Sequence, residues 1–174
     1  MKNIHFLLRY SDTLSGADTI AEHQAVLSEY SAVWMGKFGI GMANRFAELA
    51  KQQIADGNKC SLYLMHGSKY TFKANIIDVV TGSDSIDKIL TKSPKLTPSY
   101  YRKKPCSIWF KLNDISPIDM TELKNIWLYN DPASHPSARG MRGLIYLTYN
   151  DAPELNKKPN NREVNPLYTE GLFD

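Results

Sequence analysis

The sequence predicts an α+β fold: a curled, mixed or largely antiparallel β-sheet or small barrel with flanking helices. Strand-like segments follow one another in hairpin order, and two helix-like segments lie between the first strand and the second. The order is not a regular βαβ alternation, and no GxGxxG or Walker-type loop is present, which argues against a Rossmann fold. With 174 residues and 43% apolar side chains, we expect one domain over residues 1–150 and a tail or linker over residues 151–174.

The first part of the chain carries one strand signal and two helix signals. His5 to Tyr10 is predicted to be a strand. Asp18 is expected to cap a helix, in which one face is formed by Ile20, His23, Leu27 and Tyr30. A loop around Trp34 is expected next. Met42 to Ala55 then shows apolar residues at helical spacing and is stopped by Gly57.

The second part of the chain is dominated by sheet signals. Cys60 to His66 and Lys69 to Val80 are predicted to pair through a two-residue turn, Gly67-Ser68. The segments that follow are expected to be a short helix (Asp84 to Leu90), a basic loop (Ser93 to Pro105), a strand (Cys106 to Asn113), a short helical turn (Pro117 to Asn125), a long loop (Trp127 to Gly143) and a last strand (Leu144 to Tyr149).

Nothing in the sequence indicates catalysis, a metal or a cofactor. GxSxG and HExxH motifs are absent, the four histidines are scattered, and Cys60 and Cys106 have no partner at metal-ligand spacing. We therefore expect a binding domain with two buried free thiols, whose catalytic activity would come from a separate domain or partner. No stretch is suited to a signal peptide or a membrane span, and we expect a cytoplasmic protein that does not bind membranes.

Two segments favour a nucleic-acid surface. In the first, Trp34, Lys37 and Phe38 lie among the glycines at 36, 39 and 41, so that a flat ring, a cation and uncovered backbone come together. In the second, residues 92–111, there are six basic residues and no acidic one, and aromatic residues lie among them. A core role is the alternative for Trp34, and we expect Trp109 and Trp127 to be structural.

The order of these features resembles the PUA-like superfamily, and within it the EVE and YTH domains that bind modified bases. The resemblance covers residues 4–149. It rests on HFLLRYS, VWMGKFG, CSLYLMHGSKYTFKANIIDVV, CSIWFKLNDISPID and WLYNDPASHPSARGMRGLIYL. It implies a domain that turns one nucleotide into an aromatic pocket and senses a small substituent on it.

The resemblance also implies a set of site residues. Trp34 matches the first aromatic residue of the pocket, and Tyr100 or Tyr101 the second, although YTH domains have Trp there. Because adjacent side chains of an extended segment point in opposite directions, one of the two tyrosines should lie outside the pocket. The predicted base-binding residues are Trp34, Gly36, Lys37, His66, Ser68, Tyr100 and Tyr101, and the predicted phosphate-binding residues are Arg102, Lys103, Lys104, Arg139 and Arg142.

The leading hypothesis is a module that binds DNA with a modified, methylated base, as in the specificity domains of modification-dependent restriction systems of the McrBC kind, with an effector nuclease or NTPase as partner. An RNA reader on the same fold is one alternative. A second is an ASCH-like hydrolase of a modified nucleoside, in which Lys37 and Glu48 would act although no Thr is suitably placed in the sequence. A purely structural protein, without affinity for nucleic acid, is the third.

Overall fold

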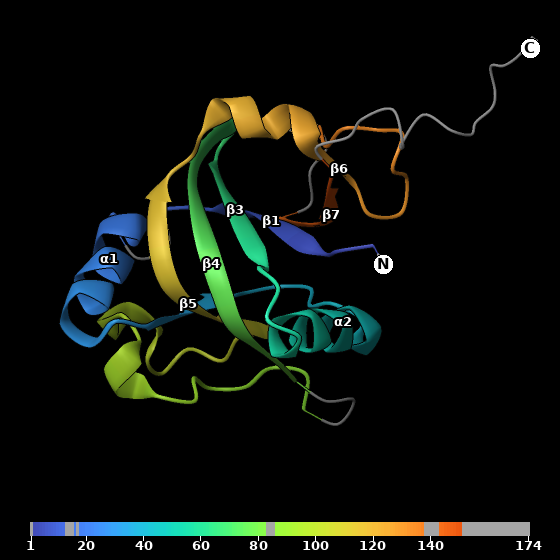
Figure 1. Cartoon of the computed structure of the whole chain (residues 1–174). Coiled ribbons are helices and arrows are strands. Elements are labelled where there is room, and N and C mark those ends of the chain that lie inside the picture. Colours follow the sequence, from blue (N-terminus) through green and yellow to red (C-terminus); the bar gives the residue numbers. More distant parts are fainter. Residues whose placement is uncertain (1, 13–15, 17, 83–85, 138–142, 151–174) are drawn as a thin grey trace, which may run out of the picture.

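The computed structural model describes residues 2–12, 16, 18–82, 86–137 and 143–150. They form one curled, open sheet of seven strands with two α-helices beside it (Figure 1). The strands are β1 (His5–Tyr10), β2 (Val33–Lys37), β3 (Ser61–His66), β4 (Lys69–Thr81), β5 (Ile108–Pro117), β6 (Ile126–Leu128) and β7 (Leu144–Tyr149), and the helices are α1 (Thr19–Tyr30) and α2 (Asn44–Ala55). The predicted α+β class is confirmed.

The strand order in the sheet is β2-β5-β4-β3-β1-β7-β6. Only β1 and β3 pair in parallel, and the other neighbours described are antiparallel. The long strands β4 and β5 bend strongly along their length (Figure 1), and their register shifts near Asn75 and Ile76. Such irregularities increase strand bending and twist, which accounts for the curl of the sheet.

The core follows the alternation of side chains along the strands. On β5, Ile108, Phe110 and Leu112 are fully buried in the main core, and Trp109 packs on the opposite face in a second cluster. This two-sided arrangement of β5 confirms the prediction from its sequence. The hairpin of β3 and β4 is also confirmed: His66 pairs with Lys69 across the turn, where Gly67 has a φ of 63°.

Both predicted helices are present with their expected signals. The Asp18 side chain accepts a hydrogen bond from the backbone N–H of Ala21 at 3.0 Å, which caps α1. Helix α2 begins at Asn44, two residues later than expected, and Gly57 follows its end with a φ of 85°. The predicted helical turn is present as a 3-10 helix over Met120–Asn125.

The secondary structure differs from the prediction in several connecting segments. Trp34 lies in a strand, β2, which pairs with β5 at the edge of the sheet. The described part of the segment expected to be a helix, residues 86–90, is not helical, because the backbone of Ile89 pairs with that of Cys106. The basic loop contains two 3-10 helices, Pro94–Leu96 and Ser99–Tyr101, and Trp127 lies in the short strand β6.

No helix in the described part of the chain is long and apolar enough to cross a membrane. The predicted tail, residues 151–174, lies outside the described residues. The same holds for Arg139 and Arg142, so the structure places neither of these two predicted phosphate-binding residues.

Candidate functional site: a cavity between β1, α1 and β2

A cavity of about 400 Å³ lies where the end of β1, the start of α1 and the end of β2 meet. Its volume falls within the range of roughly 300–1,000 Å³ that is usual for small-molecule sites. Three of the predicted base-binding residues line it: Gly36, Lys37 and Tyr101. The other lining residues are Leu8, Arg9, Tyr10, Ser11, Thr19, His23, Met35, Phe38, Gly39, Ile40 and Gly143.

Glycine at position 36 allows β2 to lie directly on the side chains of β5. A Cβ atom at Gly36 would be 2.6 Å from the Cys106 Sγ and 2.8 Å from the Trp109 ring. Any larger residue would therefore push β2 away from these buried side chains. Because Gly36 lines the cavity, this close contact also fixes the position of the cavity wall.

Lys37 holds the segment that joins β2 to α2. Its Nζ donates hydrogen bonds to the carbonyl oxygens of Phe38, at 2.9 Å, and Ile40, at 2.7 Å. Partial burial lowers the pKa of Lys37 from its ordinary value. The segment closes one side of the cavity through Phe38, Gly39 and Ile40.

Aromatic rings form another wall of the cavity. Tyr101 is 6% exposed, and its ring stacks on that of Phe38 with 5.6 Å between centroids and 22° between planes. The imidazole of His23 lies 5.6 Å from Tyr101 on a tilted plane. Burial raises the pKa of the Tyr101 hydroxyl, so this group remains neutral.

The two adjacent tyrosines differ in their relation to the cavity. Tyr100 packs edge-on against Tyr101, with 5.0 Å between centroids, and the Lys104 ammonium lies 5.1 Å from the Tyr100 ring centroid. Tyr100 is not among the residues that line the cavity. Both tyrosines belong to the 3-10 helix Ser99–Tyr101 rather than to an extended segment. Their side chains therefore diverge because of the helical backbone, and not because side chains alternate along a strand.

His23 brings an unused hydrogen-bond acceptor to the cavity wall. Its side chain is 1% exposed, and its Nδ1 lies 2.7 Å from the carbonyl oxygen of Thr19. Since a carbonyl only accepts, Nδ1 carries the proton and Nε2 has a free lone pair. Burial lowers the pKa of His23 to about 4, which keeps the ring neutral. Nε2 is buried and has no hydrogen-bond partner among the described residues.

Trp34 is a core residue behind this wall. It is 4% exposed and belongs to the same cluster of buried side chains as Tyr101, Cys106 and Trp109. The ammonium of Lys111 lies 5.7 Å from its ring centroid. Trp34 is not among the residues that line the cavity, and its indole supports the part of the sheet on which Tyr101 rests.

His66 and Ser68 lie at the exposed turn between β3 and β4. The His66 ring packs on Tyr10, with 5.2 Å between centroids, and its Nε2 is 3.6 Å from the Asp12 carboxylate. Tyr10 lines the cavity, so His66 is linked to it through one side chain, whereas no described contact links Ser68 to it.

The basic residues that follow Tyr101 are exposed. The Nε of Arg102 donates a hydrogen bond to the carbonyl oxygen of Thr97 at 2.9 Å. Lys103 and Lys104 complete a short cationic segment directly after the cavity wall. Such a segment can hold the phosphates of a nucleic acid while a base occupies the cavity.

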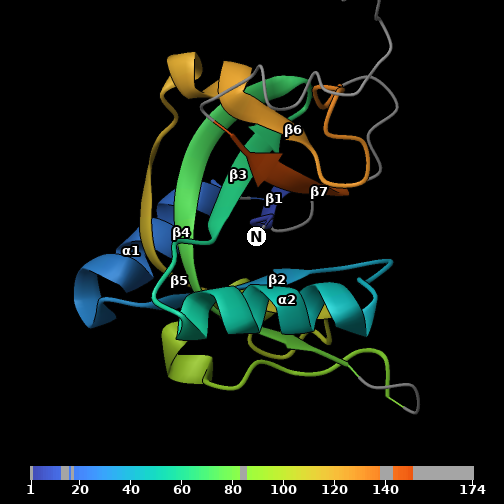
Figure 2. The same cartoon turned by 45° about the vertical axis from the view of Figure 1, so that its right-hand side comes forward.

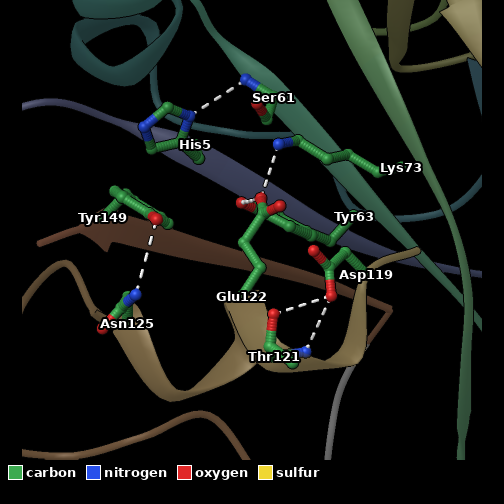
Figure 3. A network of polar contacts seen from close by, with 9 residues as sticks. All are labelled: His5, Ser61, Tyr63, Lys73, Asp119, Thr121, Glu122, Asn125 and Tyr149. Atoms are coloured by element: carbon green, nitrogen blue, oxygen red, sulfur yellow. Dashed lines mark hydrogen bonds and ion pairs between the residues drawn. The ribbon is translucent and has the colours of Figure 1, made fainter. Parts of the chain in front are cut away.

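A separate polar network lies between β3, β4 and the 3-10 helix Met120–Asn125 (Figure 3). Tyr63 donates a hydrogen bond to Glu122 at 2.6 Å, and Lys73 forms an ion pair with the same carboxylate. Burial, followed by the bond to Glu122, raises the pKa of Tyr63. Because the carboxylate is held by both partners, the network serves to fasten this helix to the sheet.

Outside the cavity, the described residues offer neither a metal site nor a reactive thiol. They contain no group of three or more His, Cys, Asp and Glu side chains that could hold a metal ion. Cys60 and Cys106 are buried and free, as predicted, and burial raises the pKa of each to about 12, so neither is a ready nucleophile. A groove of about 770 Å³ beside residues 39–44 has no aromatic lining residue.

Eleven of the fourteen residues that line the cavity were not among the predicted site residues, and Thr19, His23, Phe38 and Ile40 bear most on its chemistry. Thr19 and His23 looked like ordinary residues of the first turns of a helix. Their role depends on the contact between α1 and β2, which no local pattern shows. Phe38 lay in the aromatic and glycine-rich segment, and this neighbourhood was the available signal.

Comparison with known proteins agrees with this architecture. No curated protein sequence matches the chain. A family model described as Pua-like matches residues 6–159, which includes every strand from β2 to β7 and nearly all of β1. Domains of this kind generally bind nucleic acid or modified bases. With most of its length matched, the chain belongs to the Pua-like family.

Proposed function

We propose that the chain binds DNA that carries a modified, methylated base, and that this base turns out of the duplex into the cavity. The observation that carries the proposal is the stacked pair of Tyr101 and Phe38 in the wall of a 400 Å³ cavity, next to the exposed cations of residues 102–104. Aromatic side chains in the cavity wall can stack on a base, and the neighbouring cations can contact the phosphates of the DNA backbone.

The energy balance favours a base that meets both rings and polar groups. Turning a base out of the stack costs a few kcal/mol, and stacking on an aromatic side chain returns roughly 1–3 kcal/mol. A buried methyl group adds only about 0.8 kcal/mol. His23 lines the cavity and its Nε2 lacks a partner among the described residues, so a base amino group that reached Nε2 would satisfy this acceptor.

The role in the cell that we propose is the specificity module of a modification-dependent restriction or defence system. The Pua-like match supports a binding domain, and the EVE- and YTH-like sequence around VWMGKFG supports a modified base as ligand. In this proposal, nuclease or NTPase activity is supplied by another domain or subunit.

The proposal is tested by fluorescence anisotropy with labelled duplexes at one fixed salt concentration. Duplexes that contain 5-methylcytosine or N6-methyladenine are compared with the unmodified duplex. We expect at least one modified duplex to bind more tightly. Equal affinity for all of them would overturn the proposal.

A matched pair of variants locates the site. Phe38 and Tyr100 are both half-buried and pack against the same cluster, but only Phe38 lines the cavity. Phe38→Ala should reduce the preference for the modified duplex, whereas Tyr100→Ala should leave it unchanged. Equal losses would place the base elsewhere.

The RNA-reader alternative is tested with the same modification in single-stranded RNA. An RNA reader should bind that RNA more tightly than the modified duplex.

One observation favours hydrolysis of a modified nucleoside as a second function. Thr19, which sequence spacing did not bring near Lys37, lines the same cavity. Against it, the Lys37 ammonium donates to two backbone carbonyls, and Glu48 is exposed and not among the lining residues. Incubation with acylated and methylated nucleosides, followed by chromatography, tests this function. A hydrolase should form product, and Lys37→Met should abolish product formation.

A further inference from the structure

Ile40 is the most exposed large apolar side chain among the described residues, at 84%. It lies in the segment that joins β2 to α2, which Figure 2 shows as a turn that projects beyond β2 and returns into α2. A single exposed apolar residue is common on protein surfaces. Its position, rather than its exposure alone, suggests a function.

Ile40 stands between two hollows. On one side it lines the 400 Å³ cavity with the aromatic wall, and on the other it lines the groove of about 770 Å³. The groove also contains Lys88, Asp87 and the backbone around Gly41. Gly39 and Ile40 each line both hollows, and the exposed Ile40 is called the ridge between them below.

The backbone that carries this ridge is held in place. The Nζ of Lys37 donates hydrogen bonds to the carbonyl oxygens of Phe38 and of Ile40 itself. Gly39, between them, has a φ of 81°, a conformation that other residues adopt at a cost. An exposed apolar side chain on a fixed backbone can act as a wedge, because little conformational freedom is lost when it is inserted.

We propose that Ile40 inserts into the base stack of duplex DNA, at the place that the base leaves when it enters the cavity. This inference rests on the proposed function and adds the residue that opens the duplex. Proteins that unstack DNA use Ile, Leu, Met and Phe in this way, since an apolar side chain replaces part of the lost stacking. This ridge position places Ile40 beside the base in the cavity, and the adjoining groove leaves room for the opposite strand.

The test compares Ile40→Ser with Met120→Ser. Met120 is also well exposed, at 61%, and lines neither hollow. Each protein is titrated with two probes: a duplex in which the modified base preferred by the wild type is paired normally, and the same duplex with an abasic site opposite that base. In the second probe the base leaves the stack at a lower cost.

We expect Ile40→Ser to weaken binding to the paired duplex about 10-fold or more, since the burial of an Ile side chain is lost. Binding to the abasic-site duplex should weaken by less than about 3-fold, because the wedge is then less needed. Met120→Ser should bind both probes like the wild type. As a second readout, 2-aminopurine placed next to the modified base should brighten with the wild type, because it loses its stacking partner, and should brighten less with Ile40→Ser.

Two results overturn the inference alone. One is an equal loss on both probes, which would make Ile40 an ordinary contact residue, and the other is no loss on either. In both cases the wild type still prefers the modified duplex, so the proposed function stands. Absence of any such preference in the wild type overturns the proposed function, and the wedge with it.

Discussion

The two buried histidines, His5 and His23, should make the fold less stable in mild acid. Burial holds the pKa of each at about 4 in the folded protein, below the ordinary value of 6.5. His5 uses Nδ1 to accept a hydrogen bond from the backbone N–H of Ser61 at 2.9 Å, so its protonation would also break this bond. Both rings are therefore neutral in the native state.

The sign of the effect follows from proton binding. Between pH 6.5 and 4 the unfolded chain binds protons at these two rings and the folded chain does not, so stability falls as the pH falls. A gap of about 2.5 pKa units at 1.36 kcal/mol per unit amounts to about 3 kcal/mol for each ring over the whole window. From pH 6.0 to 4.5 the loss is about 2 kcal/mol for each.

Urea unfolding followed by tryptophan fluorescence at pH 6.0 and 4.5 measures this loss. His23→Phe removes one of the two groups, so its free energy of unfolding should fall by about 2 kcal/mol less than that of the wild type over this range. The lowered pKa of the carboxyl groups of Asp12 and Asp119 places their titration below this window. An unchanged pH dependence in His23→Phe would refute the assignment of a buried, neutral ring.

Three further predictions concern the cavity wall and the surface beside it. Trp34→Ala should reduce the free energy of unfolding by about 3–5 kcal/mol in urea titrations, because the indole is a buried core side chain. Gly36→Ala should cost about 1–3 kcal/mol in the same assay, since its Cβ would overlap the Cys106 Sγ and the Trp109 ring, and an unaffected stability would show that β2 does not lie so close to these two side chains. The double variant Lys103→Ala, Lys104→Ala should weaken modified and unmodified duplexes alike and lower the slope of log affinity against log salt by about 1.8 if both side chains contact phosphate; a loss confined to the modified duplex would contradict this role.

Most elements of the fold could be predicted because local signals coincide with the tertiary structure. The Gly67-Ser68 turn, the Asp18 cap and the alternation along β5 each depend on a few neighbouring residues. The strand β2 was not predicted, because glycine is unfavourable in strands. The stability of β2 comes from its pairing with β5 and from the space that Gly36 leaves for the Trp109 side chain.

The candidate site could be predicted in part. The segment around Trp34 does lead to the cavity, through Gly36 and Lys37, and Tyr101 forms its wall. The other site residues depend on which face of a strand each side chain occupies. Trp34 and Met35 are neighbours in sequence, but only Met35 lines the cavity. His23 could not be identified, because its free acceptor results from burial against Tyr101.

Backbone amide NMR of the labelled protein, titrated with a duplex that carries the preferred modified base, tests the central claim most directly. If the base enters the cavity, the largest chemical-shift changes that are absent with the unmodified duplex should fall on residues 36–40, on His23 and on Tyr101. Modification-specific changes that cluster on another face, such as the groove lined by Lys59, Lys73 and Asp114, would contradict the account.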